Sequence, residues 1–141
     1  MTAAEILAYF PSTLLSFLVA FSLGAVFWVA GLVIVSLITP HRELELLRAG
    51  NLPCALALGG KAVGMVLPIA AVARSAAGPL DQVIWCIVAI AVQLLAHLVL
   101  TTLLAGRLKQ EIEEDKVGGA AVFIAFMQVG AGILNNAVMS G

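Results

Sequence analysis

Five polar side chains could do chemistry in an otherwise apolar setting: Lys61, Gln93, His97, Gln128 and Asn135. Lys61 lies within residues 52–73, a run long enough to cross a bilayer, and no acid in any comparable run pairs with it. A charge at membrane depth is costly unless water, a partner or a route to the interface relieves it. We therefore treat these five residues as a candidate intramembrane polar site.

The spacing of these residues predicts two polar helix faces. Gln93 and His97 are four residues apart, and Gln128 and Asn135 are seven apart, so each pair shares a face of a helix. Counted from the inner end of each span, Lys61 and His97 lie about nine residues deep, or roughly 13 Å. One interpretation is a hydrated crevice in which His97 exchanges protons and Lys61 favours anions. The other is hydrogen bonding between helices, with Lys61 reaching the headgroups along its own aliphatic stem.

Composition indicates a membrane protein. Hydrophobic residues make up 62% of the chain and charged residues 11%, and the mean hydropathy is +1.13, which is far more apolar than a soluble domain. The 141 residues leave room for about four helices of roughly 20 residues each. The net charge of −1 and the lack of a basic stripe argue against a nucleic-acid partner. The lipid bilayer is the expected surroundings.

Polar residues divide the chain into four apolar segments without the alternation of a membrane strand. The first ends at Thr39 and Pro40, and the third ends at Gly106, before Arg107. Gly50 and Asn51 are typical of a turn between two helices. We predict an all-α integral membrane protein with an N-terminal interfacial segment and two transmembrane hairpins, at residues 1–12, 13–73 and 82–139.

A weak internal repeat favours two repeated helical hairpins. A shift of about 66 residues places Leu32 on Leu98 and Gly64 on Gly130, and it places Pro40 on Gly106. The hairpins would then be related by an axis along the membrane normal. In a chain so rich in Ala, Leu and Val, such matches also arise by chance.

The positions of the cations predict the orientation. Lysines and arginines lie mainly in the first and third connections, the second connection holds only Arg74, and both tails hold none. The first and third connections are therefore expected in the cytoplasm, with both termini in the periplasm or outside the cell. No signal peptide is expected, so the first span should be retained.

Small residues predict where helices pack closely. Gly60 with Gly64, and Ala121 with Ala125, have the spacing that lets helix backbones approach each other. They could serve the bundle of one protomer or a neighbouring copy in a homo-oligomer. Pro68 is expected to kink its helix and free a backbone carbonyl.

The connections carry most of the charge. Residues 43–48 and 107–116 are expected to form short amphipathic extensions, with Leu108 and Ile112 toward the membrane and the charges toward water. Four acids of the second connection could dock a basic partner, or they could simply form a solvated face. These candidate docking residues are Glu111, Glu113, Glu114 and Asp115.

Several motifs stand out beyond hydropathy, namely Thr39-Pro40, residues 43–51 and 55–60 with Gly64 and Pro68, and residues 122–125 and 132–135. Together they resemble the YjfL-like family of bacterial four-helix inner-membrane proteins. The resemblance implies two repeated hairpins and no established biochemical activity. Genes for proteins similar to phage-shock-type stress factors tend to lie near those of the family, which implies a role in membrane integrity. Lys116 and Asn136 are departures from the family pattern.

No enzymatic activity, metal or cofactor is expected. His41 and His97 lack the spacing of a metal site, and Cys54 and Cys86 should lie too far apart to form a disulfide. The preferred hypothesis is a scaffold or sensor for membrane stress or envelope maintenance, whose cytoplasmic hairpin tips recruit a peripheral membrane-stress protein. The alternative is a homo-oligomeric small channel or transporter with a polar crevice around Lys61 and His97.

Overall fold

The computed structural model describes residues 1–39 and 42–140, and in these residues it contains helices and no strand. The helices are α1 (Ala3–Ile38), α2 (Glu43–Arg48), α3 (Leu52–Ser75), α4 (Pro79–Glu114) and α5 (Gly119–Met139). In the described part of the chain, four helices are long and apolar enough to cross a membrane, namely α1, α3, α5 and the Pro79–Leu104 part of α4. The predicted all-α fold with four spanning helices is confirmed. The relation between the two hairpins as a repeat stays a prediction.

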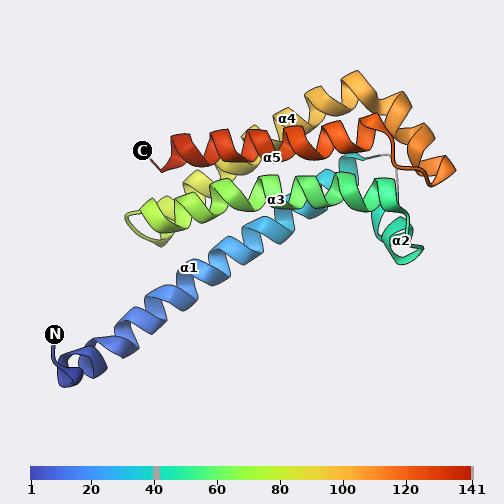
Figure 1. The fold of residues 1–141 in the computed structure, drawn as a ribbon. Coiled ribbons are helices and arrows are strands. Elements are labelled where there is room, and N and C mark those ends of the chain that lie inside the picture. Colours follow the sequence, from blue (N-terminus) through green and yellow to red (C-terminus); the bar gives the residue numbers. More distant parts are fainter. Residues whose placement is uncertain (40–41, 141) are drawn as a thin grey trace.

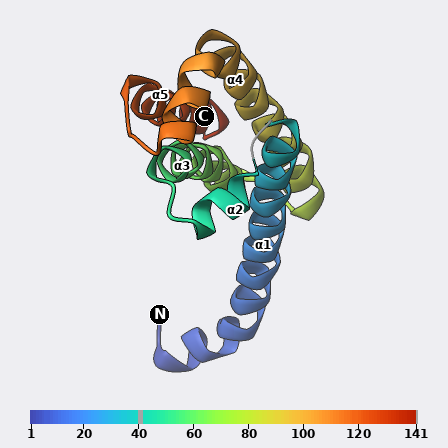
Figure 2. The ribbon, with the colours of Figure 1, turned by 90° about the vertical axis from the view of Figure 1, so that its right-hand side faces the viewer.

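The bundle is built around α3 and α5. These two helices run side by side in the same direction, with α4 packed along both, whereas α1 approaches at an angle (Figure 1). Viewed along the bundle, α1 leaves the other helices toward its N-terminus (Figure 2). The core consists of two apolar clusters, one at each end of the bundle. Cys54 and Ile124 belong to the cluster near α2, and Met65 and Cys86 belong to the other.

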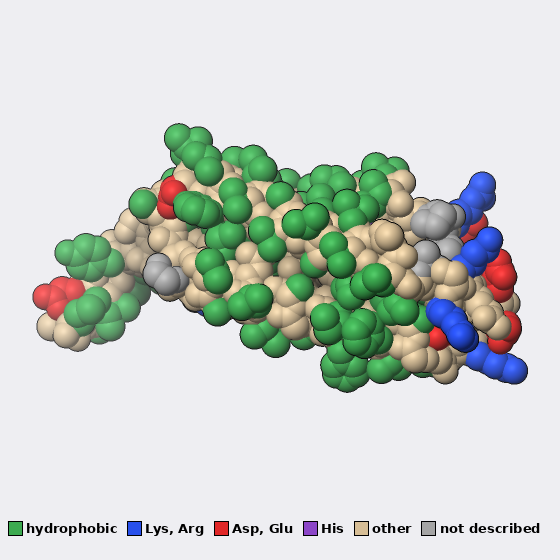
Figure 3. Space-filling model, turned by 90° about the horizontal axis from the view of Figure 1, so that it is seen from above, with side chains coloured by type: hydrophobic (Ala, Val, Ile, Leu, Met, Phe, Trp, Pro, Cys, Tyr) green, Lys and Arg blue, Asp and Glu red, His purple; other side chains and the backbone are tan. Residues whose placement is uncertain are grey.

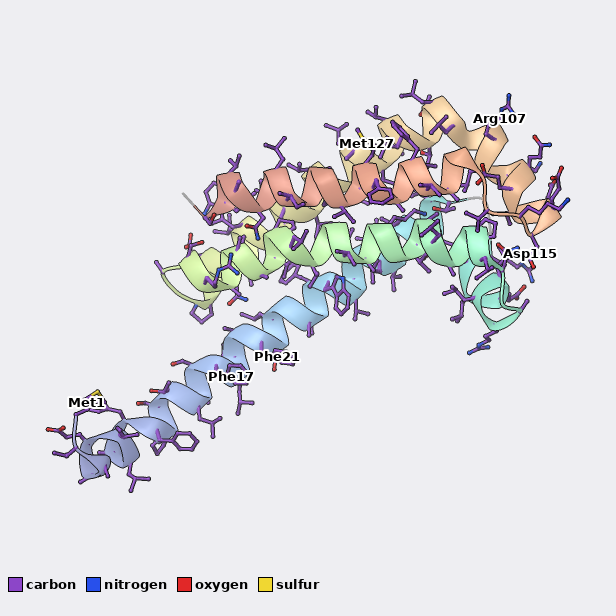
Figure 4. The ribbon with its side chains drawn as sticks, viewed as in Figure 1. Met1, Phe17, Phe21, Arg107, Asp115 and Met127 are labelled. Carbon is purple, nitrogen blue, oxygen red and sulfur yellow. The ribbon has the colours of Figure 1, made fainter. Side chains whose placement is uncertain are left out.

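The N-terminal half of α1 extends beyond the bundle. Thr2 and Glu5 form a capping box at the start of the helix. The helix is unbroken from Ala3 to Ile38, so residues 3–12 continue directly into the first span. Phe17 and Phe21 stack on this part of α1 with their ring centroids 5.8 Å apart, and both rings are exposed (Figure 4). Most of the exposed side chains in this part of α1 are apolar, which suits a surface in contact with lipid. The interfacial position of residues 1–12 remains a prediction.

The third span ends close to the expected Gly106, because the apolar part of α4 runs from Pro79 to Leu104. Gly106 is nevertheless wrong as a helix boundary. α4 continues through Gly106 to Glu114, and Asp115 ends it in the left-handed conformation with φ 49°. Leu108 and Ile112 are buried in the apolar cluster near α2, rather than facing the membrane as expected. Their burial outweighs the helix penalty of one glycine, which is about 1 kcal/mol.

The two charged connections lie at the same end of the molecule. Gly50, at φ +78°, ends α2, and the Asn51 side chain accepts a hydrogen bond from the Cys54 N–H at 3.0 Å, as the predicted turn requires. Asn51 Nδ2 also donates to the Ile112 carbonyl at 2.8 Å, which ties this turn to α4. The lysines, arginines and acids visible from above gather mainly at this end, and apolar side chains cover most of the length between the ends (Figure 3). The predicted break at Pro40, together with His41, lies outside the described residues.

Among the described helices, α3 and α5 form the most extensive contact, and three glycines bring their backbones close together along this seam. A Cβ atom added at Gly60 would collide with the backbone of Ala125, and one added at Gly64 would collide with the carbonyl of Gln128. Gly132 of α5 is equally tight against the Gly64 carbonyl. This carbonyl is the one that Pro68, which has no N–H, leaves without its helical donor. The seam therefore allows no side chain at these three glycines.

Candidate functional site

The intramembrane lysine has a partner in the structure. Lys61 Nζ of α3 lies 2.8 Å from Glu43 Oε1, and the two side chains are only 3% and 5% exposed. Glu43 is the first residue of α2 and therefore belongs to a connection rather than to another span. The expectation that the charges of this segment all face water is wrong for Glu43. The reason is that α2 folds back on α3 and turns its first side chain into the bundle.

The second oxygen of the Glu43 carboxylate is also hydrogen-bonded. Ser36 Oγ of α1 donates to Glu43 Oε2 at 2.6 Å, so α1, α2 and α3 meet at one carboxylate. Hydrogen bonds to a charged acceptor are stronger than neutral ones, and a buried ion pair needs them because both ions lose their hydration. We call Ser36, Glu43 and Lys61 the ion-pair junction. It fixes the position of α2 relative to the spanning helices.

Next to this junction, His97 of α4 contacts the end of α1. The Thr39 hydroxyl donates to the Val35 carbonyl at 2.8 Å and lies 3.4 Å from His97 Nε2. Because a hydroxyl has one proton, the Thr39 oxygen accepts at His97, and Nε2 carries the hydrogen. His97 Nδ1 is then an acceptor, and it is buried without a partner. Nδ1 can therefore accept a hydrogen bond from another group there.

Polar side chains of α4 and α5 meet farther along the bundle. Gln93 Nε2 donates to the Gln128 carbonyl at 3.3 Å, and Asn135 Nδ2 donates to the Ala89 carbonyl at 3.1 Å. Gln93 Oε1 and Gln128 Nε2 are buried and have no partner. With His97 Nδ1, they are the buried side-chain polar atoms of the described residues that lack a hydrogen bond. Gln93 and Asn135 thus make the predicted contacts between helices, and the remaining polar atoms stay available for another group.

Two of the candidate docking acids hold helix ends. The Glu111 carboxylate accepts hydrogen bonds from the N–H groups of Ala120 and Ala121 at 2.8 and 2.9 Å, which caps α5. Asp115 Oδ1 accepts from the Leu52 N–H at 3.2 Å at the start of α3. Figure 4 shows Asp115 at this tip, with Arg107 on the same end of α4. Both carboxylates are therefore already hydrogen-bonded at the start of a helix.

The other two docking candidates are directed to water. Glu113 lies 3.8 Å from Lys109 in an exposed pair, and Glu114 accepts from Gln110 at 3.0 Å.

The helix-packing candidates Ala121 and Ala125 are buried on α5, and Ala125 lies against Gly60. Cys54 and Cys86 are free and buried in different core clusters. Within the described ranges, no group of three histidine, cysteine or acidic side chains is arranged to hold a metal ion.

Sequence reasoning missed Glu43, Ser36 and Thr39 because it sought a partner for Lys61 only inside apolar runs. A useful signal was present nevertheless. Glu43 follows the first span closely, in a connection of few residues between two apolar segments. A search that includes acids within one or two turns of a span end would have identified it.

The four apolar helices and the polar groups enclosed between them define a multi-pass integral membrane protein. Residues 9–139 match the family described as Domain of Unknown Function (DUF350), and the chain belongs to that family. It is 29% identical over 128 residues to the UPF0719 inner membrane protein YjfL of Escherichia coli (strain K12), a match that covers 91% of this chain and 96% of that protein. The protein of the same name from Escherichia coli O157:H7 matches with the same identity and coverage. No solved structure matches the chain significantly.

Proposed function

We propose that this protein is a non-enzymatic sensor or scaffold of the bacterial inner membrane that acts in membrane stress or envelope maintenance. The observation that carries the proposal is the buried pair between Glu43 and Lys61, at 2.8 Å. It connects α2, at the charged end, with a spanning helix. A change in the membrane that moves α1 or α3 would therefore reach α2 directly.

The ion-pair junction has the properties of a switch with two states. Ser36, Glu43 and Lys61 come from three helices, so a relative movement of these helices breaks contacts that no other described side chain replaces. Separation of a buried ion pair leaves an uncompensated charge, which typically costs about 3–5 kcal/mol. Intermediate positions are therefore disfavoured, and α2 is either held against α3 or released into water.

A peripheral cytoplasmic protein is the proposed reader of this state. With Glu111 and Asp115 engaged at helix ends, Glu113 and Glu114 are the acids of the second tip that remain for a basic partner. The cation distribution supports the cytoplasmic position of both tips. The membrane-stress character of the partner rests on the family resemblance.

Amide hydrogen exchange of the full-length protein in nanodiscs tests the switch. Glu43→Gln and Lys61→Met should each increase exchange in residues 43–51, because α2 loses its attachment to the bundle. Glu45→Gln is the matched control, since Glu45 lies on the same helix in an exposed pair with Arg42. Unchanged exchange in both junction variants would contradict the switch.

Recovery of partners tests the docking surface. Membrane extracts should lose a peripheral partner when Glu113 and Glu114 are both changed to Gln. Glu45→Gln, at the other tip, serves as the control. Equal recovery of every partner by the variant and the unchanged protein would contradict docking at these acids.

A second candidate function is a homo-oligomeric small channel or transporter. The buried, unpartnered atoms of Gln93, His97 and Gln128 favour it, because such atoms could contact a permeating polar species. Flux into proteoliposomes should then change with His97→Gln and stay constant with Lys109→Met, which alters an exposed residue. Identical flux for all three proteins would remove the support.

A further inference from the structure

We infer that the groove bounded by α1, α2 and α3 binds one anionic phospholipid, with its phosphate at Arg48 and Arg42 and an acyl chain between α1 and α3. The groove has a volume of about 910 Å³. This size is within the range of pockets for small ligands. The inference goes beyond the proposed switch and does not depend on it.

The part of the groove between α1 and α3, away from α2, is apolar. Trp28 and Leu32 of α1 line one side, and Leu58 and Ala62 of α3 line the other. The indole N–H of Trp28 donates to the Ala62 carbonyl at 2.9 Å, which ties the two helices together at this part of the groove. Gly59 also lines the groove and is exposed, and a Cβ atom there would meet no atom within 4 Å, so the groove is open at this position. An alkyl chain is the chemistry that fits these walls.

The opposite part of the groove is lined by charged residues of the α2 region. Arg42 and Arg48 are both exposed there, and Arg42 pairs with Glu45 at 3.1 Å. Lys61 neutralises Glu43, the other acid of the lining. Arg48 has no carboxylate within salt-bridge distance among the described residues, so the lining keeps one unbalanced positive charge. A phosphodiester with a single negative charge complements it.

The order of these regions matches an amphiphile in a bilayer. The arginines lie at the charged end of the molecule, whereas Trp28 lies ten residues before Ile38, the last residue of α1. That separation corresponds to about 15 Å along a helix. Basic pockets between spanning helices are established binding sites for anionic headgroups. Inorganic phosphate would engage the arginines but would leave the apolar walls without a ligand.

Quenching of Trp28 fluorescence tests the inference directly. The full-length protein with Trp85→Phe has Trp28 as its one remaining tryptophan. It is reconstituted in phosphatidylcholine vesicles that contain increasing amounts of phosphatidylglycerol with brominated acyl chains. Brominated phosphatidylcholine provides the comparison. We expect phosphatidylglycerol to be preferred about fivefold for each arginine engaged.

Variants separate the headgroup from the acyl chain. Arg48→Gln should reduce the preference about fivefold. Lys109→Gln, an exposed cation at the same end of the molecule, should leave the preference unchanged. Gly59→Leu should fill the groove and weaken quenching by both brominated lipids. Circular dichroism confirms that each variant is folded.

The inference is overturned if the two brominated lipids quench equally, or if Arg48→Gln keeps the full preference. Displacement of brominated phosphatidylglycerol by inorganic phosphate at matched ionic strength would assign the site to free phosphate instead of lipid. The hydrogen exchange of α2 is read separately. A failure of the quenching experiment therefore leaves the proposed switch untouched, and unchanged hydrogen exchange in α2 leaves the proposed lipid site untouched.

Discussion

Two regions of α3 pack against other helices by different physical means. At the α3–α5 seam, Gly60 and Gly64 bring two backbones together without side chains between them. At the ion-pair junction, Lys61 reaches a carboxylate supplied by a short helix outside the spans. Lys61 directly follows Gly60, so the junction and the seam begin at neighbouring residues of one helix. The seam depends on shape and tolerates no added atoms, whereas the junction depends on charge and has parts that can separate.

Removal of one charge from the junction should have the largest effect on stability. Lys61→Met leaves the Glu43 carboxylate buried with only the Ser36 hydroxyl as a side-chain donor. We expect the free energy of unfolding to fall by about 3–5 kcal/mol. Reversible unfolding by denaturant in mixed micelles measures this change. Lys109→Met, which removes a cation from an exposed pair, should cost less than about 1 kcal/mol. Equal losses in the two variants would contradict the junction.

An added side chain at the seam should have the next largest effect. Gly64→Leu places atoms against the Gln128 carbonyl, so we expect a loss of about 3 kcal/mol in the free energy of unfolding. Gly130→Leu is the matched control on α5, because a Cβ atom there meets no atom within 4 Å. The same unfolding measurement compares the two. If Gly64→Leu were as stable as the control, the close approach of α3 and α5 would be refuted.

Loss of a helix cap should have a smaller effect. Glu111→Ala removes the acceptor of the Ala120 and Ala121 N–H groups, and we expect a loss of about 1–2 kcal/mol. Glu114→Ala, three residues later and bonded only to an exposed glutamine, should change stability by less than about 0.5 kcal/mol. Hydrogen exchange at the start of α5 should rise only in the first variant. A rise in both, or in neither, would contradict the assignment of Glu111 as the cap.

The smallest expected effect concerns the contact between α1 and α3. Trp28→Phe keeps an aromatic ring but removes the hydrogen bond to the Ala62 carbonyl, which should cost about 0.5–1.5 kcal/mol. Trp85→Phe is the control, since Trp85 is about half exposed and its indole N–H has no hydrogen bond to any residue that the structure describes. Thermal unfolding in detergent measures both. If Trp28→Phe unfolded at the same temperature as the unchanged protein, the hydrogen bond of Trp28 would contribute little to the attachment of α1.

The spans and the turn at Gly50 and Asn51 could be predicted from the sequence because hydropathy and local backbone chemistry determine them. The sequence also indicated small residues at a close contact, but it left open whether the partner was the same bundle. The structure places α5 of the same chain against Gly60 and Gly64. Gly132 was missed because its tight fit depends on the Gly64 carbonyl across the seam.

The parts that could not be predicted depend on tertiary contacts. α4 continues beyond Gly106 because Leu108 and Ile112 find a buried surface near α2, and no local pattern predicts that surface. Glu43 pairs with Lys61 only because α2 folds back on the bundle. Burial inside the protein, rather than position in an apolar run, decided which charges meet. The internal repeat, the oligomer and the orientation remain predictions.

A double-mutant cycle between Glu43 and Lys61 tests the central claim most directly. The free energy of unfolding in mixed micelles is measured for Glu43→Gln, Lys61→Met, the double variant and the unchanged protein. The buried pair predicts that the double variant loses at least about 2 kcal/mol less than the sum of the two single losses. Losses that add within about 0.5 kcal/mol would contradict a direct interaction and, with it, the attachment of α2 to the spanning helices.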